Sequence, residues 1–231
     1  MAPQCSWLDM EPATMHFCEE LVCNSFLVQP ANAISNVAFV IVGIYLLEIM
    51  KDQPKIFYIF PISAILVGIT SFLYHASWTF FFQIFDVSSM FILSCLLLSF
   101  NIWRLGLIST KKLIPTNLIL VIISSLLMIL IKGKSGEFIF GVEVVSVLIL
   151  EFILFKRNRD SIVYKYLNYS IFTFALAFFI WIMDVKEIWC LKENHIIQGH
   201  AVWHILNSFC FYFLYKFYLQ FQGQVNVSSD H

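Results

Sequence analysis

Two histidines four residues apart open the last long apolar run of the chain. They are His200 and His204 in the stretch GHAVWH, and His75 ends the stretch SFLYH four residues after Ser71. Residues four apart lie on one face of a helix. Three imidazoles from two helices are a ligand set of catalytic zinc, which leaves the fourth position to water. The pattern therefore predicts a zinc centre held by His75, His200 and His204.

Two more polar residues could do chemistry beside such a centre. Zinc lowers the pKa of a bound water to about 7, and Asp86 could take the proton of that water as general base. Ser71 could hydrogen-bond the water or the oxyanion. Taken singly, each feature also fits plain polarity at a helix contact. The whole set favours a metal site, and two histidines on one helix face suit a small ion better than axial ligation of haem.

The elements that must position these residues are membrane helices. The 231 residues are 60% hydrophobic and 13% charged, with a mean hydropathy of +0.81, whereas a soluble domain is about half apolar and a quarter charged. The net charge of −1 shows no excess of basic residues of the kind that nucleic-acid-binding proteins use. Helices satisfy their backbone internally, whereas a barrel would show short alternating segments. The expected fold is an all-α integral membrane bundle of seven transmembrane helices, at roughly 31–50, 56–76, 79–103, 113–131, 137–155, 164–185 and 199–219.

The basic residues set the expected orientation, with the N-terminus outside and the C-terminus cytoplasmic. With this orientation ten Lys and Arg residues lie on the cytoplasmic side and four outside, as the positive-inside rule favours. The start of the chain lacks a basic region followed by an apolar one, so no cleavable signal peptide is expected. The expected organisation is an extracytoplasmic segment over 1–29, a seven-helix catalytic domain over 30–220 and a disordered cytoplasmic tail over 221–231.

The ionisable residues that would form the site lie at one depth of the membrane in this topology. Ionisable side chains inside a bilayer are costly and are functional by default. His75, Asp86, Asp184, His200 and His204 all fall in the outer half of the membrane, although Lys and Arg alone set the orientation. Asp184 is expected either to orient a zinc histidine as a second-shell partner or to tether the sixth helix to the seventh. For Glu143 and Glu151, structural pairing is the expectation.

This constellation resembles the alkaline ceramidase family and its wider relatives, the adiponectin/progestin receptors and the Per1-type lipid-remodelling proteins. The resemblance covers nearly the whole chain in order and rests on CEE at 18–20, NAISN at 32–36, SFLYH, Asp86, Asp184 and GHAVWH. It implies that His75, His200 and His204 bind zinc, that Asp86 activates the water and that Ser71 assists. The implied reaction is hydrolysis of ceramide to a sphingoid base and a fatty acid.

The resemblance also bears on calcium and on the cysteines. Family members bind calcium through an acidic, tryptophan-containing N-terminal segment, in which Glu19 would be a ligand. Here His16 stands in place of an acid, Phe17 in place of the usual Trp, and Gln29 near the place of a Glu. Because calcium favours carboxylate oxygens, a full calcium site is not expected. The resemblance implies a disulfide between Cys18 and Cys190; free thiols are the alternative.

The function expected from the sequence is a zinc-dependent amide hydrolase that acts on ceramide in the membrane. The alternatives are a hydrolase of ester or other N-acyl lipids, a seven-helix receptor with a structural zinc, and a transporter, which the absence of a repeat disfavours. The expected partners are the lipid substrate and the bilayer, and the chain is expected to be a monomer. A bacterial inner membrane and the ER or Golgi both fit this expectation.

Overall fold

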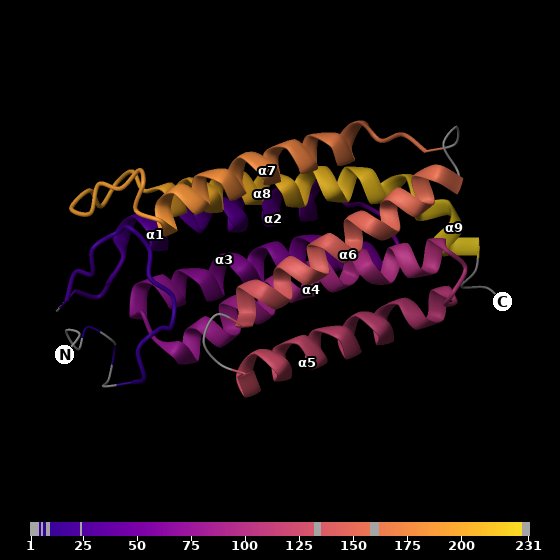
Figure 1. The fold of residues 1–231 in the computed structure, drawn as a ribbon. Helices are drawn as coiled ribbons and strands as arrows, with labels where there is room; N and C mark the ends of the chain where they lie inside the picture. Colours follow the sequence, from indigo (N-terminus) through magenta and orange to yellow (C-terminus); the bar gives the residue numbers. More distant parts are fainter. Residues whose placement is uncertain are drawn as a thin grey trace.

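The computed structural model describes residues 5, 7, 10–23, 25–131, 135–157 and 162–227. In this part of the chain, seven long helical segments run side by side along the molecule (Figure 1). The first is broken at Asn36, and one short helix follows the last. The helices are α1 (Pro30–Ser35), α2 (Val37–Ile49), α3 (Ile59–Ser77), α4 (Phe80–Arg104), α5 (Leu113–Ile131), α6 (Ser135–Arg157), α7 (Lys165–Val185), α8 (Gly199–Tyr218) and α9 (Gln222–Val227), with 3-10 turns at Lys55–Tyr58, Thr110–Lys112 and Leu219–Phe221.

Six of these helical segments are long and apolar enough to cross a membrane, counted over the described residues. They are α1 with α2, and α3 to α7 together with the turns that lead into α3 and α5. The predicted seven-helix bundle thus has its seven long helical segments, but α8 is not among the six. Its polar side chains, which include His200, His204 and Lys216, lower its hydropathy.

A tight turn joins α3 to α4 and places Ser71 and His75 beside the start of α4. Trp78 ends α3 in the left-handed region with a φ of 48°. Thr79 then caps α4, and its side chain accepts a hydrogen bond from the Phe82 N–H at 3.4 Å. Asp86 therefore lies less than two turns into α4, on the helix that packs directly on α3.

A buried ion pair and aromatic rings hold the opposite end of the bundle together. Arg104 on α4 pairs with Glu151 on α6, and both side chains are buried. The Arg104 guanidinium also lies 4.2 Å from the centre of the Phe221 ring. Phe221 and Val225 are buried in the core cluster. Within the tail expected to be disordered over 221–231, residues 222–227 form α9. Residues 228–231 lie outside the described part.

The N-terminal segment covers the other end of the bundle. Cys18 and Cys190 form a disulfide with an S–S distance of 2.03 Å, which joins this segment to the loop between α7 and α8. This is the pair that the family resemblance implies. A second disulfide links Cys5 and Cys23, a pair that neither the sequence nor the family resemblance predicted. Figure 1 shows this segment and the α7–α8 loop at one end of the bundle, and α9 at the other.

Candidate metal centre

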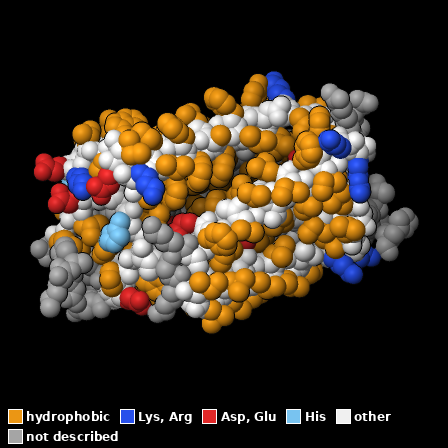
Figure 2. Space-filling model, viewed as in Figure 1, with side chains coloured by type: hydrophobic (Ala, Val, Ile, Leu, Met, Phe, Trp, Pro, Cys, Tyr) orange, Lys and Arg blue, Asp and Glu red, His pale blue; other side chains and the backbone are white. Residues whose placement is uncertain are grey.

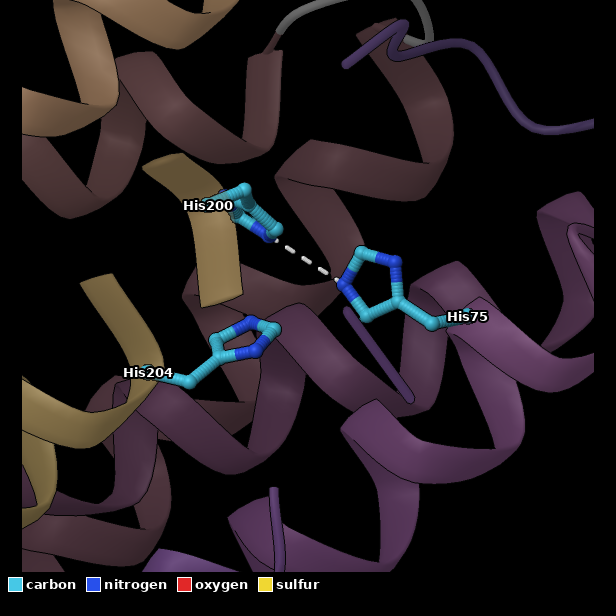
Figure 3. Close-up of side chains that lie close together, drawn as sticks. All are labelled: His75, His200 and His204. Carbon is cyan, nitrogen blue, oxygen red and sulfur yellow. Dashed lines mark hydrogen bonds between the residues drawn. The ribbon is translucent and has the colours of Figure 1, made fainter. Parts of the chain in front are cut away.

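The three histidines meet inside the bundle, at the end covered by the N-terminal segment. His75 comes from the last turn of α3, and His200 and His204 come from the first turns of α8 (Figure 3). All three are buried, and one nitrogen of each lies within 4.8 Å of the others. The Nε2 atoms of His75 and His200 are 3.1 Å apart.

Two oxygen atoms on the N-terminal side of α2 orient two of the rings. The Gln29 Nε2 donates to the Glu19 carbonyl, so its Oε1 faces the His75 Nδ1 at 2.7 Å and accepts its proton. The Ser35 hydroxyl donates to the Asn32 carbonyl, so it accepts from the His204 Nδ1 at 2.8 Å. Both rings therefore carry their proton on Nδ1 and turn an unprotonated Nε2 towards the shared space.

This donor set fits zinc. Two nitrogens bound to a tetrahedral zinc at about 2.0–2.1 Å stand about 3.4 Å apart, close to the 3.1 Å between the His75 and His200 nitrogens. Hydrogen bonds from the far nitrogen to oxygen atoms are the usual partners of zinc histidines. The Nδ1 of His200 is buried without a hydrogen-bond partner among the described residues. The three residues that could hold the ion are thus His75, His200 and His204.

Phe17 closes the centre from the N-terminal side. Its ring stacks on the His200 imidazole with 3.8 Å between the ring centres, and it also lies 5.3 Å from the ring centre of His75. Because Phe17 precedes Cys18, the disulfide to Cys190 holds the ring over the histidines. The N-terminal segment therefore forms part of the wall of the centre.

A cavity of about 640 Å³ runs from the histidines into the bundle. His200, His204, Asp86 and Ser71 line it, and most of the remaining lining consists of apolar side chains, chiefly from α4, α6, α7 and α8. The Ser71 side chain lies within hydrogen-bonding reach of the Asp86 carboxyl group. Figure 2 shows the surface hollowed between α6 and α7, where hydrophobic side chains border the recess. The structure thus brings the two predicted catalytic residues to the same space as two of the histidines.

Asp184 joins α7 to α8. Its Oδ1 accepts from the Cys18 N–H at 3.0 Å, and its Oδ2 accepts from the His200 N–H at 2.9 Å. A Cβ on Gly199 would lie 2.9 Å from the Asp184 Cβ, so only glycine permits this close approach. These contacts agree with a tether between α7 and α8, one of the two roles expected from the sequence.

Glu19 caps α1. Its Oε1 and Oε2 accept from the N–H groups of Ala31 and Asn32 at 2.8 and 2.9 Å, and His195 Nδ1 lies 3.1 Å from Oε1. Burial raises the pKa of this carboxyl group, although the two backbone N–H groups and His195 oppose that shift. Among the described residues, only the three histidines form a cluster with metal-ligand spacing. In this structure Glu19 therefore acts as a cap of α1 and a partner of His195.

The two glutamates of α6 have structural partners away from the histidines. Glu143 accepts hydrogen bonds from Ser94 and Ser124, and the Cys95 thiol lies 3.4 Å from it. Glu151 pairs with Arg104 at the far end of the bundle. Both observations agree with the structural pairing expected from the sequence.

Sequence reasoning missed the residues that orient the histidine rings. In the sequence, Gln29 stood out only because it lies near a position where family members often have a Glu. Ser35 was only one of several polar residues on the first helix. The cluster of Asn32, Ser35 and Asn36 was the available signal, because three polar groups in an apolar helix need partners.

A bundle of apolar helices with an internal three-histidine cluster defines an integral membrane protein with a candidate metal centre. The sequence matches the family model described as Ceramidase over residues 10–229, nearly its whole length. The chain therefore belongs to the ceramidase family, and membership implies a hydrolase acting on amide bonds. A comparison with curated proteins finds no match.

Proposed function

We propose that this protein is a zinc-dependent hydrolase that cleaves the amide bond of ceramide inside the membrane. The observation that carries the proposal is the buried cluster of His75, His200 and His204, with Asp86 and Ser71 beside it in one apolar cavity. Membership of the ceramidase family supports the substrate class.

The residues would divide the work as follows. A bound zinc ion would act as a Lewis acid towards the amide carbonyl and make water acidic near neutral pH. Asp86 takes a proton from the water that attacks the amide carbon and returns it to the amide nitrogen as the C–N bond breaks. Ser71 holds the Asp86 carboxyl group in position. Gln29 and Ser35 keep the proton of His75 and His204 on Nδ1.

The shape of the cavity supports a lipid substrate. Most of its lining is apolar, and it is bordered by α6 and α7, so a hydrocarbon chain can enter from the side (Figure 2). The polar groups that would act on an amide, which are Ser71, Asp86, His200 and His204, line this cavity together. A low-dielectric pocket also strengthens the electrostatic stabilisation of a developing oxyanion.

We also propose that the histidine end faces the extracytoplasmic side and that α8 crosses the membrane as a seventh span. On the face that Figure 2 shows, a group of Lys and Arg side chains lies at the end of the bundle away from the histidines, as the positive-inside rule favours for the cytoplasmic side. Both disulfides lie at the opposite end, and disulfides persist on the oxidising side of a membrane.

The test is hydrolysis of labelled ceramide by detergent-purified protein, with and without a zinc chelator. We expect His204→Ala to lose both bound zinc and fatty acid release. Asp86→Asn should keep its zinc and lose activity by roughly 10²–10⁴-fold, the usual contribution of a general base. Release that survives both substitutions and chelation would refute the mechanism. If zinc is bound but only an ester lipid is cleaved, the alternative lipid hydrolase is correct.

A further inference from the structure

Asn207 is a polar side chain that lines the cavity beyond the histidines. Asn207 follows His204 on α8 by three residues, which places it about 4.5 Å further along the helix axis. It lines the same cavity. Around it the lining is largely apolar and includes Phe39, Phe174 and Phe211. A polar amide in such surroundings costs free energy unless it finds hydrogen-bond partners.

The Asn207 amide is only partly satisfied by the protein. Its Nδ2 donates to the Trp203 carbonyl one turn earlier at 2.8 Å, which anchors the side chain to its own helix. Among the described residues its Oδ1 has no protein partner. The side chain is half-buried, so the oxygen can accept a hydrogen bond from a molecule in the cavity.

The proposed substrate brings a hydroxyl group to this depth. In a ceramide, the carbon next to the one that bears the amide nitrogen carries a hydroxyl group, at the start of the sphingoid chain. When the amide lies at the histidines and this chain runs into the apolar cavity, the hydroxyl group, three bonds from the amide nitrogen, enters the cavity with it. A buried hydroxyl group without a partner is unfavourable.

We propose that Asn207 accepts a hydrogen bond from this hydroxyl group and is a specificity-determining residue. It selects ceramides over N-acyl lipids that have the same amide but lack the hydroxyl group. The inference rests on the proposed function, because it assumes that the amide binds at the histidines. Asn207 would recognise the hydroxyl group, whereas the metal centre acts on the amide.

The test compares kcat/KM for a ceramide and for its 3-deoxy analogue with the same acyl chain. We expect the protein to prefer the hydroxylated lipid by roughly tenfold, the value of one good hydrogen bond. Asn207→Leu, which keeps the branching at Cγ and removes the polar atoms, should abolish this preference by lowering kcat/KM for the ceramide alone. Ser208→Ala is the matched control, because Ser208 is the next residue, bonds within its own helix and does not line the cavity. It should keep the preference.

A second readout separates this inference from the proposed function. Both lipids would be tested for displacement of a fluorescent ceramide from chelator-treated protein and from Asn207→Leu. A binding preference that Asn207→Leu removes, without any hydrolysis, would uphold the Asn207 site and refute the proposed function. Hydrolysis with equal preference in the protein and in Asn207→Leu would overturn the site alone. An equal loss for both lipids in Asn207→Leu would mean a structural role, and failure to bind or cleave either lipid would overturn both.

Discussion

At the scale of single residues, the histidine centre depends on groups that no zinc-binding pattern contains. Gln29 and Ser35 each accept the Nδ1 proton of one histidine and so present the other nitrogen to the shared space. Phe17 stacks on the third ring. Partners of this kind fix the tautomer and the orientation of a ligating imidazole. The position of Gln29 also joins the centre to the N-terminal segment, because its Nε2 donates to the Glu19 carbonyl.

Gln29→Leu should weaken zinc binding by roughly 10–100-fold, the range found when such partners are removed. The His75 Nδ1 would lose its acceptor, and the ring could turn or exchange tautomers. The measurement is zinc affinity by competition with a chelator of known affinity. Gln29→Glu keeps an acceptor for His75 and should bind zinc nearly as well. Equal affinity in Gln29→Leu and the unaltered protein would contradict this role.

At the scale of elements, the bundle is held at its two ends by different means. Near the histidines, Asp184 joins the end of α7 to the first turn of α8 and to the Cys18 N–H, and the disulfide to Cys190 adds a covalent link. At the far end, the buried pair of Arg104 and Glu151 joins α4 to α6. Between the ends, the cavity separates α6 from α7 and α8.

Arg104→Met should destabilise the bundle by about 3–5 kcal/mol, because it leaves the buried Glu151 carboxylate without its partner. The measurement is thermal unfolding in detergent. Replacing both residues by Met should restore most of the stability, since no unpaired charge remains in the core. If the double substitution is as unstable as the single one, packing of Arg104 on Phe221 is the main contribution.

Gly141→Trp should block the cavity and leave the metal centre intact. Gly141 lines the cavity on α6, and a Cβ there would meet nothing within 4 Å, so the larger side chain can enter the free space. We expect kcat/KM for ceramide to fall by roughly tenfold or more, with unchanged zinc content. Gly223→Trp on α9 is the control, because its position is equally open but lies outside the cavity lining. Full activity of Gly141→Trp would show that the substrate binds elsewhere.

At the scale of the whole molecule, the proposed reaction needs an apolar interior that reaches the lipid phase and a polar centre at one end. Among the described residues, six helical segments are apolar enough to cross a membrane. The most polar long helix, α8, carries two of the three histidines and Asn207. The same polar side chains lower the hydropathy of α8 and line the cavity with groups that can bind a metal ion or form hydrogen bonds.

The orientation predicts which ends react with a membrane-impermeant thiol reagent. Glu187→Cys, on the α7–α8 loop, should be labelled from the extracytoplasmic side of sealed membranes. Lys51→Cys, on the loop after α2, should be labelled only after the membrane is opened. Both positions are exposed, and the two free cysteines of the described part, Cys95 and Cys210, are buried. The reverse labelling pattern would invert the proposed topology.

The sequence by itself determined the class of this protein and the residues of the candidate centre. Hydropathy and helix length are local properties, so the seven long helices followed from runs of apolar residues, and i to i+4 spacing placed His200 and His204 on one face. Only the tertiary structure decided how Asp184, Glu19, Gln29 and Asn207 are used. Each of these side chains acts on a partner from a different segment or faces a cavity between helices. Such contacts depend on how the helices pack, which no local pattern in the chain contains.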